Sequence, residues 1–210
     1  MPRHSKRIDP WLELGFAVLL AATTVLSAWC AYQATVWEGV QQQAFSEADA
    51  ARAEATRLDG RANHVEATDL ILFTEYWSAL VGGRDALADQ FYRRFPPTLK
   101  AATDAWLATR PLENPTAPGS PFDLPQYRVA EREEADGQLV LAETKVQAAR
   151  VANERSDTYV ALTVIFASVL FVEAVGHTFE SRTLRALTLL VGGLLLAAVV
   201  FGLIALVWLK

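Results

Sequence analysis

Residues 14–37 read LGFAVLLAATTVLSAWCAYQATVW, a run of 24 residues without a charged side chain. A second uncharged run of 24 residues spans 186–209, and residues 158–179 are apolar except for hydroxyl groups, Glu173 and His177. About 20 apolar residues, at ~1.5 Å rise per residue, cross the ~30 Å hydrocarbon core of a bilayer. The sequence therefore predicts an all-α integral membrane protein with three transmembrane helices. We place these spans at residues 11–37, 158–179 and 186–209.

The composition of the chain agrees with a membrane protein. Hydrophobic residues make up 52% of the 210 residues, and charged residues make up only 20%. The net charge of −5 argues against nucleic-acid binding, which needs a basic face. The basic start followed by an apolar run is also the pattern of a signal peptide. This run is longer than a signal core, so we expect it to remain as an uncleaved anchor.

Positive charges predict the orientation in the membrane. Short loops rich in Lys and Arg stay in the cytoplasm. Both the N-terminal tail, 1–10, and the short link between the second and third spans, 180–185, are basic. Their basic residues are Arg3, Lys6, Arg7, Arg182 and Arg185. We therefore expect a cytoplasmic N-terminus and an extracytoplasmic segment 38–157.

The extracytoplasmic segment begins and ends with a helical pattern. Small and apolar residues recur at alternating spacings of four and three in an outgoing limb, 38–81, and in a return limb, 127–157. In the outgoing limb they are Ala44, Ala48, Ala51, Ala55, Leu58, Ala62, Val65 and Leu72, with polar Asp69 interrupting the series. In the return limb and just beyond it they are Ala135, Leu139, Ala142, Val146, Ala149, Asn153, Ser156 and Val160. We predict that the limbs extend the first two spans as an antiparallel coiled-coil hairpin.

Residues 82–126 predict a small helical, Pro-rich head. Gly82 and Gly83 end the outgoing limb, a short helix can run from 84 to about 94, and a second from 96 to about 110. Five prolines between 111 and 125 predict an extended tip. Aromatic residues gather in and around the head at Phe73, Tyr76, Trp77, Phe91, Tyr92, Phe95, Trp106, Phe122 and Tyr127. They can form a core of the head's own, or a surface for a partner or for self-association.

The catalytic motifs that we sought are absent from the sequence. It has no Gly-x-Ser-x-Gly, no Gly-rich phosphate loop, no Cys-x-x-Cys and no His-Glu-x-x-His. The three histidines are His4, His64 and His177, and the one cysteine is Cys30. These few residues give little material for a metal or nucleophile site. We therefore expect a protein that is not an enzyme and needs no cofactor or metal.

Polar residues near one end of the second span are candidates for a site. Glu173, His177 and Glu180 share a helix face. An acid in hydrocarbon is costly and usually faces a partner or a water-filled path. The full candidate cluster is Glu13, Glu173, His177, Glu180, Arg182 and Arg185. It can be an interfacial set of ion pairs that fixes the hairpin, or a cation or proton site.

The third span carries small residues that favour close helix packing. They form two small-x-x-x-small pairs, which allow helices to approach closely in lipid. The pairs are Gly193 with Ala197 and Ala198 with Gly202. Their neighbours can be lipid, spans of the same chain or spans of another copy.

Residues 27–39, SAWCAYQATVWEG, resemble the end of the first span in a group of bacterial membrane proteins of unknown function. In that group a Trp-x-Ala-Tyr-Gln-Ala-type segment precedes a long Ala-rich helical insertion, and two closely spaced spans end the chain. The resemblance covers this motif and the layout of most of the chain. It implies a helical protein of the bacterial inner membrane, and it lends no catalytic residue.

These features together favour a non-enzymatic, self-associating membrane scaffold or accessory subunit that presents an extracytoplasmic helical head. Its expected partners are the lipid bilayer, further copies of the chain, and another membrane or periplasmic protein that binds the aromatic head. We expect no nucleic-acid partner. The alternative is a subunit of a homo-oligomeric ion or proton channel or pathway that uses Glu173 and His177.

Overall fold

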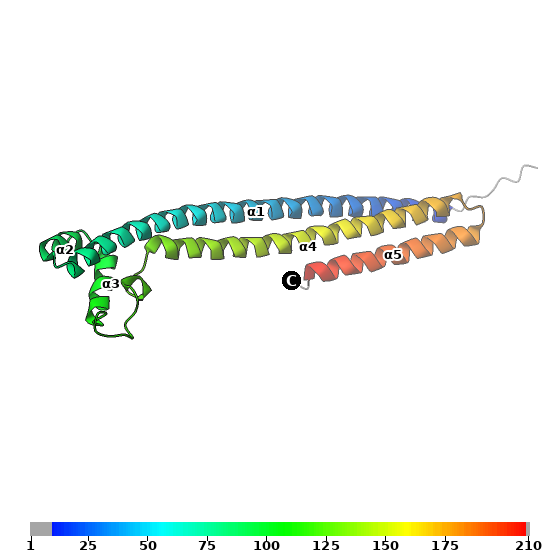
Figure 1. Cartoon of the computed structure of the whole chain (residues 1–210). Helices are drawn as coiled ribbons and strands as arrows, with labels where there is room; N and C mark the ends of the chain where they lie inside the picture. Colours follow the sequence, from blue (N-terminus) through cyan, green and yellow to red (C-terminus); the bar gives the residue numbers. More distant parts are fainter. Residues whose placement is uncertain (1–9, 209–210) are drawn as a thin grey trace, which may run out of the picture. The chain divides into compact units, whose positions relative to one another are not determined.

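The computed structural model describes residues 10–208 of the chain, with side chains up to residue 204. Within this part all regular elements are helices (Figure 1). They are α1 (Pro10–Val81), α2 (Asp85–Tyr92), α3 (Pro97–Ala108), the 3-10 helix η1 (Pro121–Asp123), α4 (Ala130–Thr178) and α5 (Arg182–Trp208). The all-helical prediction is confirmed. The predicted basic tail lies outside the described residues except for Pro10, and so does Leu209 of the third predicted span.

Three of these helices, α1, α4 and α5, are long and apolar enough to cross a membrane. Only 17%, 28% and 11% of their most apolar windows, in that order, are buried inside the chain. Most apolar side chains of the spans therefore face outward, as they do in proteins surrounded by lipid. These helices indicate a membrane-embedded protein.

The chain divides into two compact units, which cut across α1 and α4. The membrane unit contains the residues up to 44 and from 147 onward, and the polar unit contains residues 45–146.

In the membrane unit, buried side chains of α1 and α4 repeat every seven residues. In α1 they include Phe16, Thr23 and Cys30, and in α4 they include Tyr159, Phe166 and Glu173. A seven-residue repeat keeps side chains on one stripe of a helix that faces a neighbour. The Ser156 hydroxyl donates a hydrogen bond of 3.0 Å to the Ala34 carbonyl, which joins α4 to α1.

Two glycines let α5 approach the other spans. A side chain at Gly192 would stand 3.2 Å from Leu19 of α1, and a side chain at Gly176 of α4 would collide with Thr188 of α5. Larger residues at either position would force the helices apart.

In the polar unit, α1 buries a stripe of small residues. Ala48, Ala51, Ala55, Leu58 and Ala62 are all buried. On α4 the buried residues include Ala135, Ala142 and Val146. The side chain of Lys145 pairs with Glu47 at 2.6 Å, and Arg132 pairs with Asp59 and, at 2.8 Å, with Glu66.

The predicted stripe of α4 is wrong at two positions. Leu139 is 52% exposed and Val160 is 50% exposed. Tyr159 is buried in place of Val160, and Ala152, one residue before the predicted Asn153, is buried as well. Residues three and four positions apart lie on the same side of a helix, so spacing alone does not decide between them. In α1, Asp69 does not interrupt the buried stripe, because Asp69 is itself buried.

The head has an aromatic core, as one of our two interpretations predicted. All nine predicted aromatic residues belong to one cluster, in which Phe73, Tyr76, Phe95 and Trp106 are buried. The ring of Phe73 meets that of Trp106 edge to face, with 5.5 Å between ring centroids, a favourable arrangement for aromatic pairs. The Trp106 indole N–H donates to the Pro118 carbonyl at 2.7 Å, which fastens the Pro-rich tip to α3.

Candidate functional site

Glu173 of α4 is a buried acid enclosed by all three spans. Its side chain is only 2% exposed, and its Oε1 lies 3.2 Å from the hydroxyl oxygen of Thr23 in α1. On the α5 side, a Cβ placed on Gly192 would stand 3.7 Å from Cγ of Glu173. Among the residues whose side chains are described, none makes a hydrogen bond to Oε2 of Glu173. One oxygen of this acid therefore has a polar partner and the other has none.

A cavity of about 360 Å³ adjoins this acid. Its lining residues are Glu13, Phe16, Ala17, Leu20, Glu173, Ala174 and His177. Glu13 and His177 are exposed, in contrast to Glu173. The His177 ring rests on Phe16, with 5.1 Å between ring centroids. The cavity thus brings together three of the six residues of the predicted cluster.

The other members of the predicted cluster are arranged differently. Arg185 lies over the ring of Phe16, 5.7 Å from its centroid, and its Nε has no hydrogen-bond partner among the described residues. Glu180 and Arg182 are exposed in the link and at the start of α5. Glu173 is buried, whereas His177 and Glu180 are exposed, and of these two only His177 lines the cavity beside Glu173.

Sequence reasoning missed Thr23, although a signal for it exists. Thr23 lies seven residues after Phe16 and seven before Cys30, so it is a polar residue on an otherwise apolar heptad stripe. Gly192 was missed because its role depends on contact with α1 and α4, which no local pattern encodes.

The predicted small residues of α5 face outward. At Gly193 and Gly202 an added side chain would meet no atom within 4 Å, and Ala197 and Ala198 are exposed. Gly193 also lines an apolar groove of about 520 Å³. The groove's other lining residues, from α1 and α5, are Trp11, Leu14, Gly15, Val18, Leu19, Ala22, Leu189 and Leu196. These residues therefore remain available for contact outside the chain.

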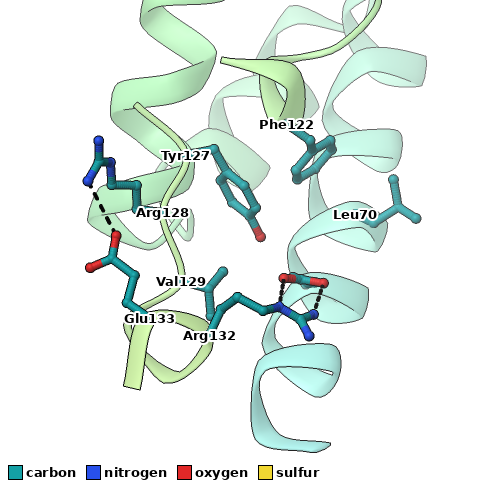
Figure 2. A pocket seen from close by; sticks show the side chains of 8 residues that line it. Leu70, Phe122, Tyr127, Arg128, Val129, Arg132 and Glu133 are labelled. Atoms are coloured by element: carbon teal, nitrogen blue, oxygen red, sulfur yellow. Dashed lines mark hydrogen bonds and ion pairs between the residues drawn. The ribbon is translucent and has the colours of Figure 1, made fainter. Parts of the chain in front are cut away.

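The polar unit contains an open cleft of about 600 Å³, shown in Figure 2. It is lined by Glu66, Leu70, Phe122, Tyr127, Arg128, Val129, Arg132 and Glu133. Two ion pairs flank the apolar side chains: Arg128 with Glu133 at 3.3 Å, and Arg132 with Glu66 at 2.8 Å. Apolar side chains flanked by charges of both signs can receive an apolar side chain of a partner protein.

Beside this cleft, the buried Asp69 accepts a hydrogen bond of 3.0 Å from the hydroxyl of Tyr127. Burial raises the pKa of the Asp69 carboxyl, and the hydrogen bond partly offsets this effect. Burial also raises the pKa of Tyr127, and the hydrogen bond to Asp69 raises it further. Next to this pair, the guanidinium of Arg132 in α4 donates hydrogen bonds to three side chains of α1, those of Asp59, Asn63 and Glu66.

Among the described residues, no group of three or more His, Cys, Asp or Glu residues is placed to hold a metal ion. No protein-family model, curated protein or solved structure matches the chain. Its function is therefore inferred from its own geometry.

Proposed function

We propose that this chain is a non-enzymatic, self-associating membrane scaffold or accessory subunit. The observation that carries the proposal is the outward face of α5. The chain uses Gly176 and Gly192 for its own close helix packing, whereas Gly193 and Gly202 leave open space. Small residues of this kind let helices of different chains approach closely in lipid, where backbone proximity and dispersion drive association.

The apolar groove between α1 and α5 also supports self-association through this face of α5. Gly193 lines this groove, so the groove and the small residues share one edge of α5. A transmembrane helix of a second copy would bury both at once. The proposed assembly is therefore a homo-oligomer held together within the membrane.

We further propose that α1 and α4 form an antiparallel coiled-coil hairpin that continues the first two spans. The alternating spacing of buried residues from Ala44 to Ala62 supports this arrangement. The order of the ion pairs supports it as well. Lys145 pairs with Glu47, whereas Arg132, 13 residues earlier on α4, pairs with Asp59, 12 residues later on α1.

The proposed location is the bacterial inner membrane, with a cytoplasmic N-terminus and residues 38–157 outside the cytoplasm. Arg182 and Arg185 at the start of α5 support this orientation, because short basic links are retained in the cytoplasm. The head would then offer its cleft to another membrane or periplasmic protein. A cysteine replacing Leu112, which is 76% exposed, in a Cys30→Ala chain should react with a membrane-impermeant thiol reagent in intact spheroplasts. Labelling only after lysis would reverse the orientation.

Substitutions on the outward face of α5 test self-association. Gly193→Leu and Gly202→Leu should shift the protein in lipid nanodiscs or mild detergent to a smaller mass, measured by sedimentation or by light scattering. Gly137→Leu is the matched control, because Gly137 lies on α4 in the polar unit and a side chain there also meets open space. A wild-type chain that is monomeric, or leucine variants that keep the wild-type mass, would refute association through this face.

The second candidate function is a homo-oligomeric ion or proton pathway. The cavity that brings Glu13, Glu173 and His177 together favours it. Wild-type protein reconstituted in vesicles would then carry a proton or cation flux that Glu173→Gln reduces without loss of assembly. Absence of flux from assembled wild-type protein would exclude this candidate and leave the scaffold.

A further inference from the structure

Thr23 has one hydroxyl proton and two oxygen atoms within reach. Its Oγ1 lies 2.8 Å from the carbonyl oxygen of Leu19 and 3.2 Å from Oε1 of Glu173. A hydroxyl group has a single hydrogen to donate. The other five threonines of α1 all donate to the carbonyl four residues earlier, at 2.7–3.2 Å. The shorter contact and this common habit of helical threonines assign the Thr23 proton to Leu19.

With that proton engaged by Leu19, a proton on Glu173 can complete the contact between Thr23 and Glu173. We propose that Glu173 is a proton-binding site within the spans, and that its protonated carboxyl group donates to Oγ1 of Thr23. Oε2 is then the carbonyl oxygen of an uncharged acid. This assignment explains why Oε2 is buried without a donor. A carboxylate there would be a buried charge without a partner, which apolar surroundings strongly disfavour.

The charged groups around the cavity do not supply an alternative partner. Glu13 of α1 and His177 of α4 line the same cavity but are exposed, and neither makes a hydrogen bond to Oε2. Arg185 of α5 directs its guanidinium to the ring of Phe16. No described cluster near the acid has the ligands for a metal ion. The ligand of Glu173 is therefore a proton. This inference concerns one carboxyl group and holds for a scaffold and for a pathway alike.

Infrared spectroscopy of the full chain in lipid at neutral pH tests the proposal directly. The spectrum should contain the carbonyl band of a protonated carboxyl group that Glu173→Gln removes. Asp69→Asn is the matched control, because Asp69 is the other acid buried among the described residues and its replacement should leave this band in place. Thr23→Val removes the acceptor of the proposed hydrogen bond and should move the band to higher frequency, whereas Thr23→Ser should not. A wild-type spectrum with no band that depends on Glu173 overturns the proposal.

A chemical label gives an independent reading without any substitution. Dicyclohexylcarbodiimide, a small apolar reagent, adds to protonated carboxyl groups: a carboxyl oxygen bonds to the carbodiimide carbon, and the proton moves to a carbodiimide nitrogen. The cavity offers the reagent a route to Glu173, and mass mapping locates the adduct. Glu13 lines the same cavity and is exposed, so its labelling shows that the reagent has reached the cavity.

The pH dependence of labelling decides between the two forms of the acid. Between about pH 5.5 and 7.5 the protonated fraction of an ordinary glutamate falls about 100-fold. Labelling of Glu173 should instead change less than about twofold over this range if its proton is retained. A fall in Glu173 labelling as large as that of an ordinary glutamate overturns the proposal. So does a Glu173 that stays unlabelled at both pH values while the infrared band is also missing.

Discussion

Replacing Ala48 with leucine tests how closely α1 packs in the polar unit. The side chain of Ala48 is 0% exposed, and its neighbours on the same stripe, Ala51 and Ala55, are also buried. A fully buried alanine leaves no room for the added carbon atoms of leucine, and overpacking of this kind costs ~1–3 kcal/mol. For a unit of about 100 residues, 1 kcal/mol lowers the melting temperature by roughly 4–8 °C. A loss of about 2 kcal/mol therefore predicts a fall of roughly 8–16 °C.

The matched control is Ala50→Leu, which makes the same chemical change two residues away at an exposed position. Alanine and leucine are both strong helix formers, so the control should leave the melting temperature almost unchanged. Tryptophan fluorescence during heating of the full chain in nanodiscs is a suitable assay, because Trp77 and Trp106 belong to the aromatic core of the head. Equal losses at both positions, or no loss at Ala48, would refute close packing along this stripe.

Three further predictions concern the head and its cleft. Arg132→Ala should lower the free energy of unfolding in urea more than Arg128→Ala does. Arg132 contacts three acceptors and is 35% exposed, whereas the side chain of Arg128 is 70% exposed and its one ion pair is screened by solvent. Equal losses would contradict this ranking. The pKa of Asp69 is raised on folding, so its contribution to stability is present at low pH and is lost as the pH rises through the raised pKa. Asp69→Asn should therefore flatten the dependence of the melting temperature on pH above about pH 4, and an unchanged profile would count against a buried acid. Trp106→Phe removes the hydrogen bond to the Pro-rich tip, worth about 0.5–1.5 kcal/mol, so limited proteolysis within residues 109–119 should become faster, and wild-type cleavage rates would show that this bond does not hold the tip.

The spans and the head helices could be predicted because their signals are local. Long uncharged runs need no tertiary information, and the predicted helix from Pro96 begins at Pro97, where proline at the first helical position is favoured. The aromatic core could be predicted only as one of two interpretations of the same residues. Composition shows that aromatic residues are concentrated in this segment, but not whether their side chains point inward or outward.

The remaining features depend on contacts between distant parts of the chain. Leu139 is apolar and fits the predicted spacing, yet it is 52% exposed, because spacing along one helix does not show which side meets a neighbour. In the sequence, polar Asp69 interrupts the apolar series. Its burial is explained by the hydrogen bond from Tyr127, which lies 58 residues later in the chain. Thr23 likewise acquires its role only when Glu173, 150 residues later in the chain, is brought next to it.

Gly192 has a consequence for how the protein is made. Chains are synthesised from the N-terminus, so α4 emerges before α5. Until α5 arrives, the side of Glu173 that Gly192 later covers has no helix against it. A nascent chain that stops in the link after α4 would present a carboxyl group to the bilayer, where such a group is costly. The last span thus closes the site, and we expect truncated products to be retained by the insertion machinery or removed by membrane proteases.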